Sequence, residues 1–278
     1  MGKSRLLLLV TPPREGDFHN DNHEQLTRAF AGLNWQIDTQ PHTYVLDNKL
    51  SDYDLVWPVG FGPREEYNAR VAALSQIPAD RIVTPATKQR DLHSKFAWLT
   101  HAPESHRGSR VEDFVDLLTQ GSQWVLKPNA GSFGRAVQLI TDPREIDLSS
   151  YLSRGDDWLL QRYVPEIMQG EHRTLTAGNK IIGTYKRVPL EGFKANLSHH
   201  GEAMASPLPK LDEDIVESTH QRLIDEHVGF AAIDTCAGFV MEVNVANPGG
   251  IGTLEKLYGG RPATSVAQAV LSSLKQRA

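Results

Sequence analysis

The sequence has a single cysteine, Cys236, among its 278 residues, so it can form no disulfide within the chain. Low cysteine use is typical of reducing compartments, and we expect a cytoplasmic protein. Long apolar runs are also lacking, because the run from Leu6 to Val10 is too short to span a membrane. Positive charge is not in excess, since 34 acidic residues outnumber 29 lysines and arginines. This balance argues against nucleic acid as the main partner.

The composition is that of a globular protein, with 40% hydrophobic and 23% charged residues, and the length allows two or three small domains. Strand and helix signals alternate in the first part of the chain. Strands are expected at 6–10, 35–38 and 55–59, and helices at 23–33 and 64–76, the second opened by Pro63. The continuous apolar strand at 6–10 is typical of a parallel sheet buried on both faces.

Ligands of an open α/β sheet tend to bind beyond the carboxyl ends of its strands. The polar loop at 11–22 follows the first strand, so Asp17, His19 and Asn20 are candidates for substrate contact. His19 and His23 could instead suggest a metal site, but a loop leading into a helix explains this spacing more simply.

A glycine-rich turn lies between two expected strands at 124–127 and 136–140, after a helix expected at 88–100 that carries Lys95. The turn contains Gly131, Ser132 and Gly134, and the backbone N–H groups of such a turn can cradle phosphate oxygens. Lys127 ends the first strand and can add a charge to the same anion. The strand-to-helix phosphate motif ending in Gly-Lys-Ser/Thr is absent, and a merely flexible turn is an equal alternative.

Arg187 shares a strand face with Tyr185 within a hairpin expected at 172–188. A structural salt bridge and a phosphate clamp are both open as roles for Arg187. The preceding strand, at 158–164, stops at Pro165, and its end could offer backbone groups to a purine. The long loop at 189–209 has the length of a lid or binding loop.

A last hairpin, at 230–245, collects oxygen ligands. Asp234, Glu242 and Asn244 fall on one face if the loop is Cys236-Ala237-Gly238 and Asp234 opposes Val240, while Met241, Val243 and Val245 go to the other face. Two carboxylates and an amide are hard ligands suited to Mg²⁺. An exposed polar sheet face is the alternative.

The order of these pieces resembles the ATP-grasp superfamily, most closely the bacterial glutathione synthetases and next the ribosomal-protein glutamate ligases. The resemblance covers roughly residues 85–278. The matching stretches are KFAWL at 95–99, LKPNAGSFG at 126–134, QRYVPEIMQGEHR at 161–173, YKRVP at 185–189, NL at 196–197 and IDTCAGFVMEVNVANP at 233–248.

The resemblance implies an α/β (α+β ATP-grasp) fold. A small N-terminal parallel α/β domain, residues 1–86, would precede two α+β subdomains, 87–163 and 164–278, that enclose ATP. The implied nucleotide contacts are Lys95, Lys127 and Arg187 at the phosphates, the flap Gly131, Ser132, Phe133 and Gly134 over them, Gln161, Tyr163 and Val164 at adenine, and Glu171 at the ribose. Asp234, Glu242 and Asn244 would be the ligands of two Mg²⁺ ions, for which Mn²⁺ could substitute.

The activity implied by the resemblance is amide-bond formation between a small amino-acid or peptide carboxylate and an amine, through an acyl phosphate, in a homo-oligomer that binds neither nucleic acid nor membrane. Lys95, Lys127 and Arg187 would stabilise charge on the transferred phosphoryl group. The sequence departs from glutathione synthetases where substrate is expected, in the loop after Asn196-Leu197 and in the run that follows Asn244. The candidate substrate contacts there are Asn196, His199, His200, Asn247, Gly249 and Gly250. Amino-acid addition to a protein or carrier tail and a non-catalytic ATP-binding regulatory module are therefore alternative functions.

Overall fold

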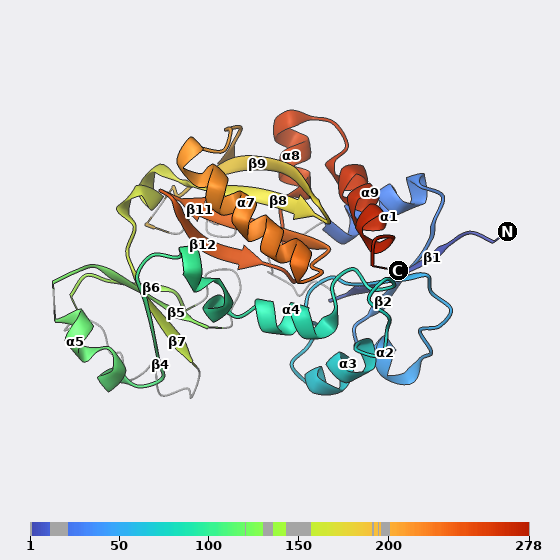
Figure 1. Ribbon diagram of the computed structural model, residues 1–278, viewed down its shortest axis with the longest axis horizontal. Helices are drawn as coiled ribbons and strands as arrows, with labels where there is room; N and C mark the ends of the chain where they lie inside the picture. The colour runs from blue at the N-terminus through green and yellow to red at the C-terminus, as the bar shows by residue number, and fades with distance from the viewer. Residues whose placement is uncertain are drawn as a thin grey trace.

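Three separate β-sheets organise the chain, as the computed structural model in Figure 1 shows. The structure describes residues 2–11, 22–119, 121–129, 136–142, 157–190, 192–193, 195 and 201–277. A parallel sheet has the strand order β2-β1-β3, and two antiparallel sheets have the orders β4-β7-β5-β6 and β10-β9-β8-β11-β12.

The parallel sheet has its central strand, β1, buried on both faces, as predicted, while the edge strand β2 is partly exposed. It consists of β1 (Arg5–Val10), β2 (Gln36–Pro41) and β3 (Leu55–Pro58). Leu6 and Leu8 pack toward α1 (Asn22–Gly32), and Leu7 and Leu9 join the apolar cluster that includes residues of α2 (Tyr44–Asp47) and α3 (Tyr67–Leu74). Alternate side chains of β1 therefore enter two different cores.

The helix expected to open at Pro63 begins instead at Tyr67. The guanidinium of Arg70 donates to the carbonyl oxygens of Glu65 (2.5 Å) and Phe61 (3.1 Å) and also to that of Pro63. These bonds satisfy the carbonyl groups of a non-helical backbone segment after β3.

The smaller antiparallel sheet is covered on one face by short helices around a core that includes Phe114, Trp124, Leu126 and Trp158. Its elements are β4 (Ser105–Gly108), η2 (Val111–Asp113), α5 (Val115–Leu118), β5 (Trp124–Pro128), β6 (Gln138–Ile140) and β7 (Trp158–Arg162). The strand β4 was not predicted, because its Ser-His-Arg-Gly sequence has no apolar alternation and only its pairing with β7 makes it a strand.

The prediction of a single helix at 88–100 is also wrong. The chain forms α4 (Ala86–Leu92) and a separate 3₁₀ helix, η1 (Lys95–His101), with extended backbone at Ser94. Trp98 Nε1 donates to the carbonyl oxygen of Leu92 (2.7 Å), and Ser94 Oγ donates to Asn129 Oδ1 (2.8 Å). Tertiary bonds thus replace helical ones and turn Lys95 toward the end of β5.

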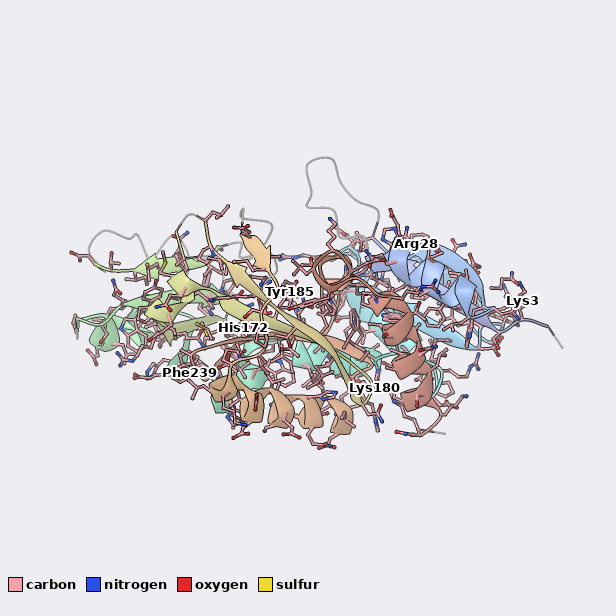
Figure 2. The ribbon with its side chains drawn as sticks, turned by 90° about the horizontal axis from the view of Figure 1, so that it is seen from above. Lys3, Arg28, His172, Lys180, Tyr185 and Phe239 are labelled. Carbon is pink, nitrogen blue, oxygen red and sulfur yellow. The ribbon has the colours of Figure 1, made fainter. Side chains whose placement is uncertain are left out.

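The larger antiparallel sheet carries helices on both faces, and Figure 2 shows α7 along one side of it. Its strands are β8 (Glu171–Ala177), β9 (Lys180–Val188), β10 (Glu202–Met204), β11 (Phe230–Cys236) and β12 (Phe239–Asn244), and η4 (Pro165–Gln169) connects β7 to β8. The helices are α7 (Lys210–Asp225), α8 (Ile251–Tyr258) and α9 (Pro262–Leu274). The helix α8 and the strand β10 were not predicted.

The strand β11 has two faces with different roles. Ala231 and Ile233 pack with Val216 and Leu223 of α7, so the alternation turns Asp234 to the opposite face. At the end of this hairpin, the carboxylate of Asp212 accepts hydrogen bonds from Thr235 Oγ1 (2.9 Å) and the backbone N–H of Gly238 (2.8 Å).

The predicted register of this hairpin is wrong, because the loop has two residues and not the three expected. The turn contains only Ala237 and Gly238, with φ of 51° and 82°, which is the backbone of a tight two-residue hairpin. Thr235 therefore opposes Val240 instead of Phe239.

A β-bulge in the same hairpin places Asp234 and Glu242 on one face, as predicted, although the predicted register was wrong. Asp234 lies directly opposite Glu242, and the register shifts between Asp234 and Thr235. The extra residue is Met241, which packs near Cys236 and not with Val243 as expected. The two carboxylates still share a face because the bulge compensates for the shorter loop.

One apolar core joins the parallel sheet to the larger antiparallel sheet. Leu6 and Trp57 belong to the same cluster as Phe230 and Val266, and the rings of Trp57 and Phe230 lie 6.0 Å apart edge to face. This core fixes β1 and β3 beside the start of β11. The domain boundaries expected after residues 86 and 163 stay predictions.

Candidate active site

A transverse row of polar side chains crosses four strands of the larger sheet. Glu242 of β12 lies opposite Asp234 of β11, Asp234 lies opposite Arg173 of β8, and Arg173 lies opposite Tyr185 of β9. Directly opposed residues of antiparallel strands point to the same face. Residues up to 69 positions apart in the sequence are thus neighbours in one row.

Asp234 is the centre of this row and is 1% exposed. Arg173 holds it with two parallel hydrogen bonds, from Nε to Oδ1 (2.8 Å) and from Nη2 to Oδ2 (2.7 Å), and Nη2 of Arg187 lies 2.8 Å from Oδ2. Burial alone would raise the pKa of Asp234, but the charges of Arg173 and Arg187 outweigh it and lower the pKa. The side chain is therefore an ionised carboxylate between two guanidinium groups.

Arg187 also contacts Glu171, which opposes it on β8. Burial raises the pKa of Glu171, and the positive charge of Arg187 only partly offsets this effect. The salt bridge that the sequence left open for Arg187 therefore exists, with two buried carboxylates as its partners. Within the described part of the chain, Nε of Arg187 and the hydroxyl of Tyr185 have no hydrogen-bond partner.

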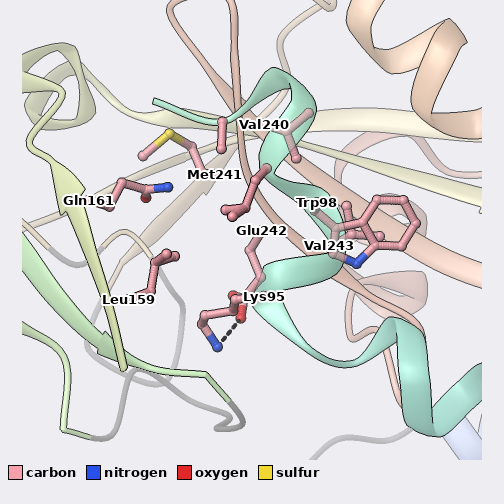
Figure 3. Close-up of a pocket in the computed structure, with 10 residues that line it drawn as sticks. Lys95, Trp98, Leu159, Gln161, Val240, Met241, Glu242 and Val243 are labelled. Atoms are coloured by element: carbon pink, nitrogen blue, oxygen red, sulfur yellow. Dashed lines mark ion pairs between the residues drawn. The ribbon is translucent and has the colours of Figure 1, made fainter. Parts of the chain in front are cut away.

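Two lysines approach the row from the other elements. Nζ of Lys95, on η1, lies 3.3 Å from Oε1 of Glu242, as the dashed line in Figure 3 marks. Nζ of Lys127, at the end of β5, donates to Oε1 of Gln161 (2.7 Å), whose Nε2 donates to Oγ of Ser105 (3.0 Å). Gln161 therefore orients Lys127, and the adenine contact expected of Gln161 stays a prediction.

The pKa values of Lys127 and Glu242 reflect this setting. Burial lowers the pKa of Lys127 to about 8, assisted by the charge of Lys95 and opposed by that of Glu242. Burial would raise the pKa of Glu242, but the charge of Lys95 outweighs it and the pKa is lowered. Glu242 differs from Asp234 in exposure, because 43% of its side chain remains accessible.

Among the residues that the structure describes, cations outnumber carboxylates in this cluster. Its charged members are Lys95, Lys127, Arg173, Arg187, Glu171, Asp234 and Glu242. Four potential positive charges face three carboxylates, one of which, Glu171, has a raised pKa. A buried surplus of positive charge is costly without an anion, so this arrangement favours a polyanionic ligand.

The segment after β12 closes one side of the cluster. The amide oxygen of Asn244 accepts from the backbone N–H groups of Ala246 (3.2 Å) and Asn247 (3.3 Å). The carbonyl oxygen of Gly249 accepts from Nη1 of Arg173 (3.2 Å). Gly250 has φ of 131°, and a Cβ there would lie 2.7 Å from the hydroxyl oxygen of Tyr185, so the close approach requires glycine.

The parallel sheet reaches the same segment. Nδ2 of Asn22, at the start of α1, donates to the carbonyl oxygen of Pro248 (2.7 Å) and to Oδ1 of Asn247 (3.1 Å). The backbone N–H of Gly60, just beyond β3, donates to the carbonyl oxygen of Ala246 (3.0 Å). The carboxyl-end edge of the parallel sheet, where substrate contacts were expected, is therefore hydrogen-bonded to the strand end that follows Glu242.

Among the expected site residues that the structure describes, most come together. Those in the cluster or adjoining it are Lys95, Lys127, Gln161, Glu171, Arg187, Asp234, Glu242, Asn244, Asn247, Gly249 and Gly250. Tyr163 and Val164 belong to an apolar cluster with Cys236, and their contact with adenine stays a prediction. Outside the described residues lie Asp17, His19, Asn20, Gly131, Ser132, Phe133, Gly134, Asn196, His199 and His200.

Arg173 is the site residue that the sequence reasoning missed. It lies two residues after Glu171, and therefore on the same strand face. Its position opposite Asp234 depends on the pairing of β8 with β11, which brings together residues 61 apart in sequence. Strand alternation could have placed Arg173 beside Glu171, but not beside Asp234.

Asp234 and Glu242 fit a hard divalent cation by their chemistry. They are ionised oxygen ligands directly opposite one another, with Asn244 two residues along β12. Among the residues that the structure describes, no group of three or more His, Cys, Asp or Glu side chains is arranged to hold a metal. A cation here would therefore need further oxygens from water or from a ligand, which is usual for Mg²⁺.

Comparison with known proteins identifies the family. The model of the family "Prokaryotic glutathione synthetase, ATP-grasp domain" matches residues 93–259, which is more than half of the chain. The chain therefore belongs to this ATP-grasp family. The matched range includes all seven charged residues of the cluster, whereas the parallel sheet lies outside it.

Individual relatives agree with this family. Glutathione synthetase of Prochlorococcus marinus subsp. pastoris is 23% identical over 251 residues, which cover 85% of this chain and 82% of that protein. Two other curated glutathione synthetases are matched over only 49% and 50% of their own length. The substrates of glutathione synthetases are therefore properties of those proteins and require a test here.

Solved structures confirm the predicted ATP-grasp fold. The crystal structure of D-cycloserine synthetase DcsG has a TM-score of 0.73 at 16% identity, covering 98% of this chain and 100% of that one. An ATP-grasp RimK domain protein from Sphaerobacter thermophilus has a TM-score of 0.69 at 21% identity, covering 96% and 100%.

Family and fold together define the class of protein. The chain is an ATP-dependent acid–amino-acid ligase, as predicted. Ligases of this kind use ATP with divalent metal ions and act on small amino acids or peptides. In the ranges that the structure describes, no helix has the length and apolar character needed to cross a membrane.

Proposed function

We propose that this ligase joins a small amino-acid or peptide carboxylate to an amine through an acyl phosphate, in the manner of a glutathione synthetase. The observation that carries this proposal is the surplus of buried positive charge beside two face-sharing carboxylates, Asp234 and Glu242. Such a site suits a nucleoside triphosphate and its metal, and ligation through an acyl phosphate needs no protein nucleophile.

The cations would bind the nucleotide phosphates. Lys95 and Lys127 approach the carboxylates from η1 and β5, and Arg187 approaches them from the sheet. Each exchanges a carboxylate or amide partner for a phosphate oxygen when the nucleotide binds. Catalysis then consists of positioning and of stabilising charge on the transferred phosphoryl group.

Asp234 and Glu242, with Asn244, would hold Mg²⁺, as two ions for which Mn²⁺ could substitute. Bound there, the metal neutralises charge on the phosphate oxygens during transfer. Asn244 must release its bonds from Ala246 and Asn247, at 3.2 and 3.3 Å, to become a ligand.

The two substrates would meet on the Gly249–Gly250 side of the cluster. Asn247 and Gly249 are joined to Asn22 and Arg173 there, so the segment lies between the parallel sheet and the charged row. The substrate carboxylate attacks the terminal phosphoryl group and releases ADP. The amine then displaces phosphate from the acyl phosphate and forms the amide.

A donor panel tests this function. The protein is incubated with Mg·ATP and pairs of carboxylates and amines, starting with γ-glutamylcysteine plus glycine, while ADP and phosphate are measured. We expect release of ADP only when both members of one pair are present. ATP binding without turnover for any pair would contradict ligation and favour the regulatory module, and turnover only with a peptide tail would favour modification of a protein.

The low pKa of Lys127 predicts a pH dependence of nucleotide binding. Burial lowers this pKa to about 8, whereas bound phosphates would favour the ammonium form. Binding then takes up a proton above pH 8, so affinity falls as the pH rises through this value. We expect the Kd for ADP, measured by calorimetry, to increase about ten- to thirtyfold between about pH 7 and 9.5.

The matched control is Lys127→Arg, which keeps the positive charge throughout this range. We expect its Kd for ADP to change much less with pH than that of the wild type. Identical pH profiles for the two proteins would show that Lys127 does not contribute its charge to nucleotide binding.

A further inference from the structure

We infer that Arg173 is a positioning residue that keeps Asp234 from coordinating the metal until nucleotide binds. When Arg173 exchanges Asp234 for a nucleotide phosphate, it also releases its bond to the segment before α8. This inference rests on the proposed function, because it assigns Asp234 to the metal. Arg173 was not among the residues that the sequence indicated, and its role follows from its contacts.

Every nitrogen of the Arg173 guanidinium has a separate partner. Nε and Nη2 bind the two oxygens of Asp234 at 2.8 and 2.7 Å, and Nη1 donates to the carbonyl oxygen of Gly249 at 3.2 Å. The side chain is 11% exposed. Two-pronged binding of this kind is strong and leaves the carboxylate few free directions in which to coordinate a cation.

A metal approaching Asp234 alone meets two competing cations. Arg173 occupies both oxygens, and Nη2 of Arg187 lies 2.8 Å from Oδ2. Displacing Arg173 would leave a buried charge without its carboxylate, which is costly, whereas Arg187 would keep its ion pair with Glu171. Nucleotide phosphates remove this cost, because they offer new acceptors to the arginines while the metal takes the carboxylates. The ion pairs therefore make metal binding depend on nucleotide.

The third bond of Arg173 extends this exchange to the substrate side. Gly249 follows Pro248, whose carbonyl oxygen accepts from Asn22 at 2.7 Å. A shift of Arg173 toward phosphate releases the carbonyl of Gly249 and frees the segment that reaches the parallel sheet. Nucleotide and metal binding would thus be coupled to the arrangement of residues 247–250.

The test is the binding of Mn²⁺ to the full chain without nucleotide, measured by electron paramagnetic resonance. If Arg173 withholds Asp234, Arg173→Met should bind nucleotide-free Mn²⁺ at least about tenfold more tightly than the wild type, because one charged competitor is lost. This gain in Mn²⁺ affinity is opposite in sign to the loss of affinity expected if Arg173 only maintained the structure of the site. Arg173→Lys should fall between the two, since lysine keeps the charge but cannot form the paired bonds.

Arg90→Met is the matched control, because Arg90 pairs with Asp91 at 2.7 Å on α4, outside the cluster. Its Mn²⁺ affinity should equal that of the wild type. Circular dichroism establishes folding, and Arg173→Lys carries the comparison if the methionine variant does not fold. Nucleotide-free Mn²⁺ binding that is no tighter in the Arg173 variants overturns the inference alone. Absence of protein-bound Mn²⁺ from the wild type even with ADP overturns the metal assignment and this inference with it.

Discussion

Glu242→Gln is expected to reduce turnover by about 10²–10³-fold or more while the protein remains folded. The substitution keeps the size of the side chain but removes one of the two charges proposed to hold the metal. Glu242 is 43% exposed at its side chain, and its ion pair with Lys95, at 3.3 Å, contributes little to folding in such a setting. Turnover is measured by ADP release with the active donor pair, and folding by thermal melting.

The control for this variant is Glu226→Gln, which removes a carboxylate paired with Lys88 at 2.5 Å away from the cluster. It should keep wild-type turnover. Full activity of Glu242→Gln would remove Glu242 from the metal site, whereas a large fall in its melting temperature would show that the carboxylate is mainly structural.

Asp234→Ala is expected to lose activity and, unlike Glu242→Gln, to lower the free energy of unfolding by about 3–5 kcal/mol. Asp234 is 1% exposed and is the partner of both Arg173 and Arg187. Its removal leaves Arg173 buried without a carboxylate, while Arg187 retains Glu171. Urea unfolding of Asp234→Ala and of the wild type gives the difference in unfolding free energy, provided that its slope against urea concentration is the same for both.

Asp91→Ala is the comparison, because Asp91 pairs with Arg90 while 57% of its side chain is exposed. Its unfolding free energy should stay within about 0.5 kcal/mol of the wild type. A loss for Asp234→Ala as small as that for Asp91→Ala would mean that the arginines find other partners, and the account of a buried, tightly balanced cluster would be wrong. The contrast between Asp234 and Glu242 separates a carboxylate that also stabilises the fold from one used for function.

The carboxylate hairpin shows how an error in the sequence reasoning can leave its conclusion intact. The expected three-residue loop is a two-residue turn at Ala237 and Gly238, and a bulge at Met241 compensates for it. Period-two alternation was sufficient to place Asp234 and Glu242 on one face, because the apolar residues Ile233 and Val243 must enter the core beneath α7. The bulge itself leaves no signal in a single sequence.

Helix breaks and short strands were predicted less well, for a related reason. The apolar spacing of residues 88–100 fits one helix, yet Trp98 and Ser94 bond to Leu92 and Asn129 and divide it. The strand β4 and the helix α8 gain their stability from partners far along the chain. Local propensity is weak compared with such tertiary contacts.

The sequence by itself determined the parallel first sheet, the ATP-grasp resemblance, and the face that carries Asp234 and Glu242, because apolar alternation and motif order are local properties of the chain. Only the tertiary structure decided the partners of those side chains: Arg173 with Asp234, Lys95 with Glu242, and Gln161 with Lys127. Each pair joins residues on different elements, and the pairing of strands and the packing of helices fix those distances. The charge balance of the site therefore exists only in the folded protein.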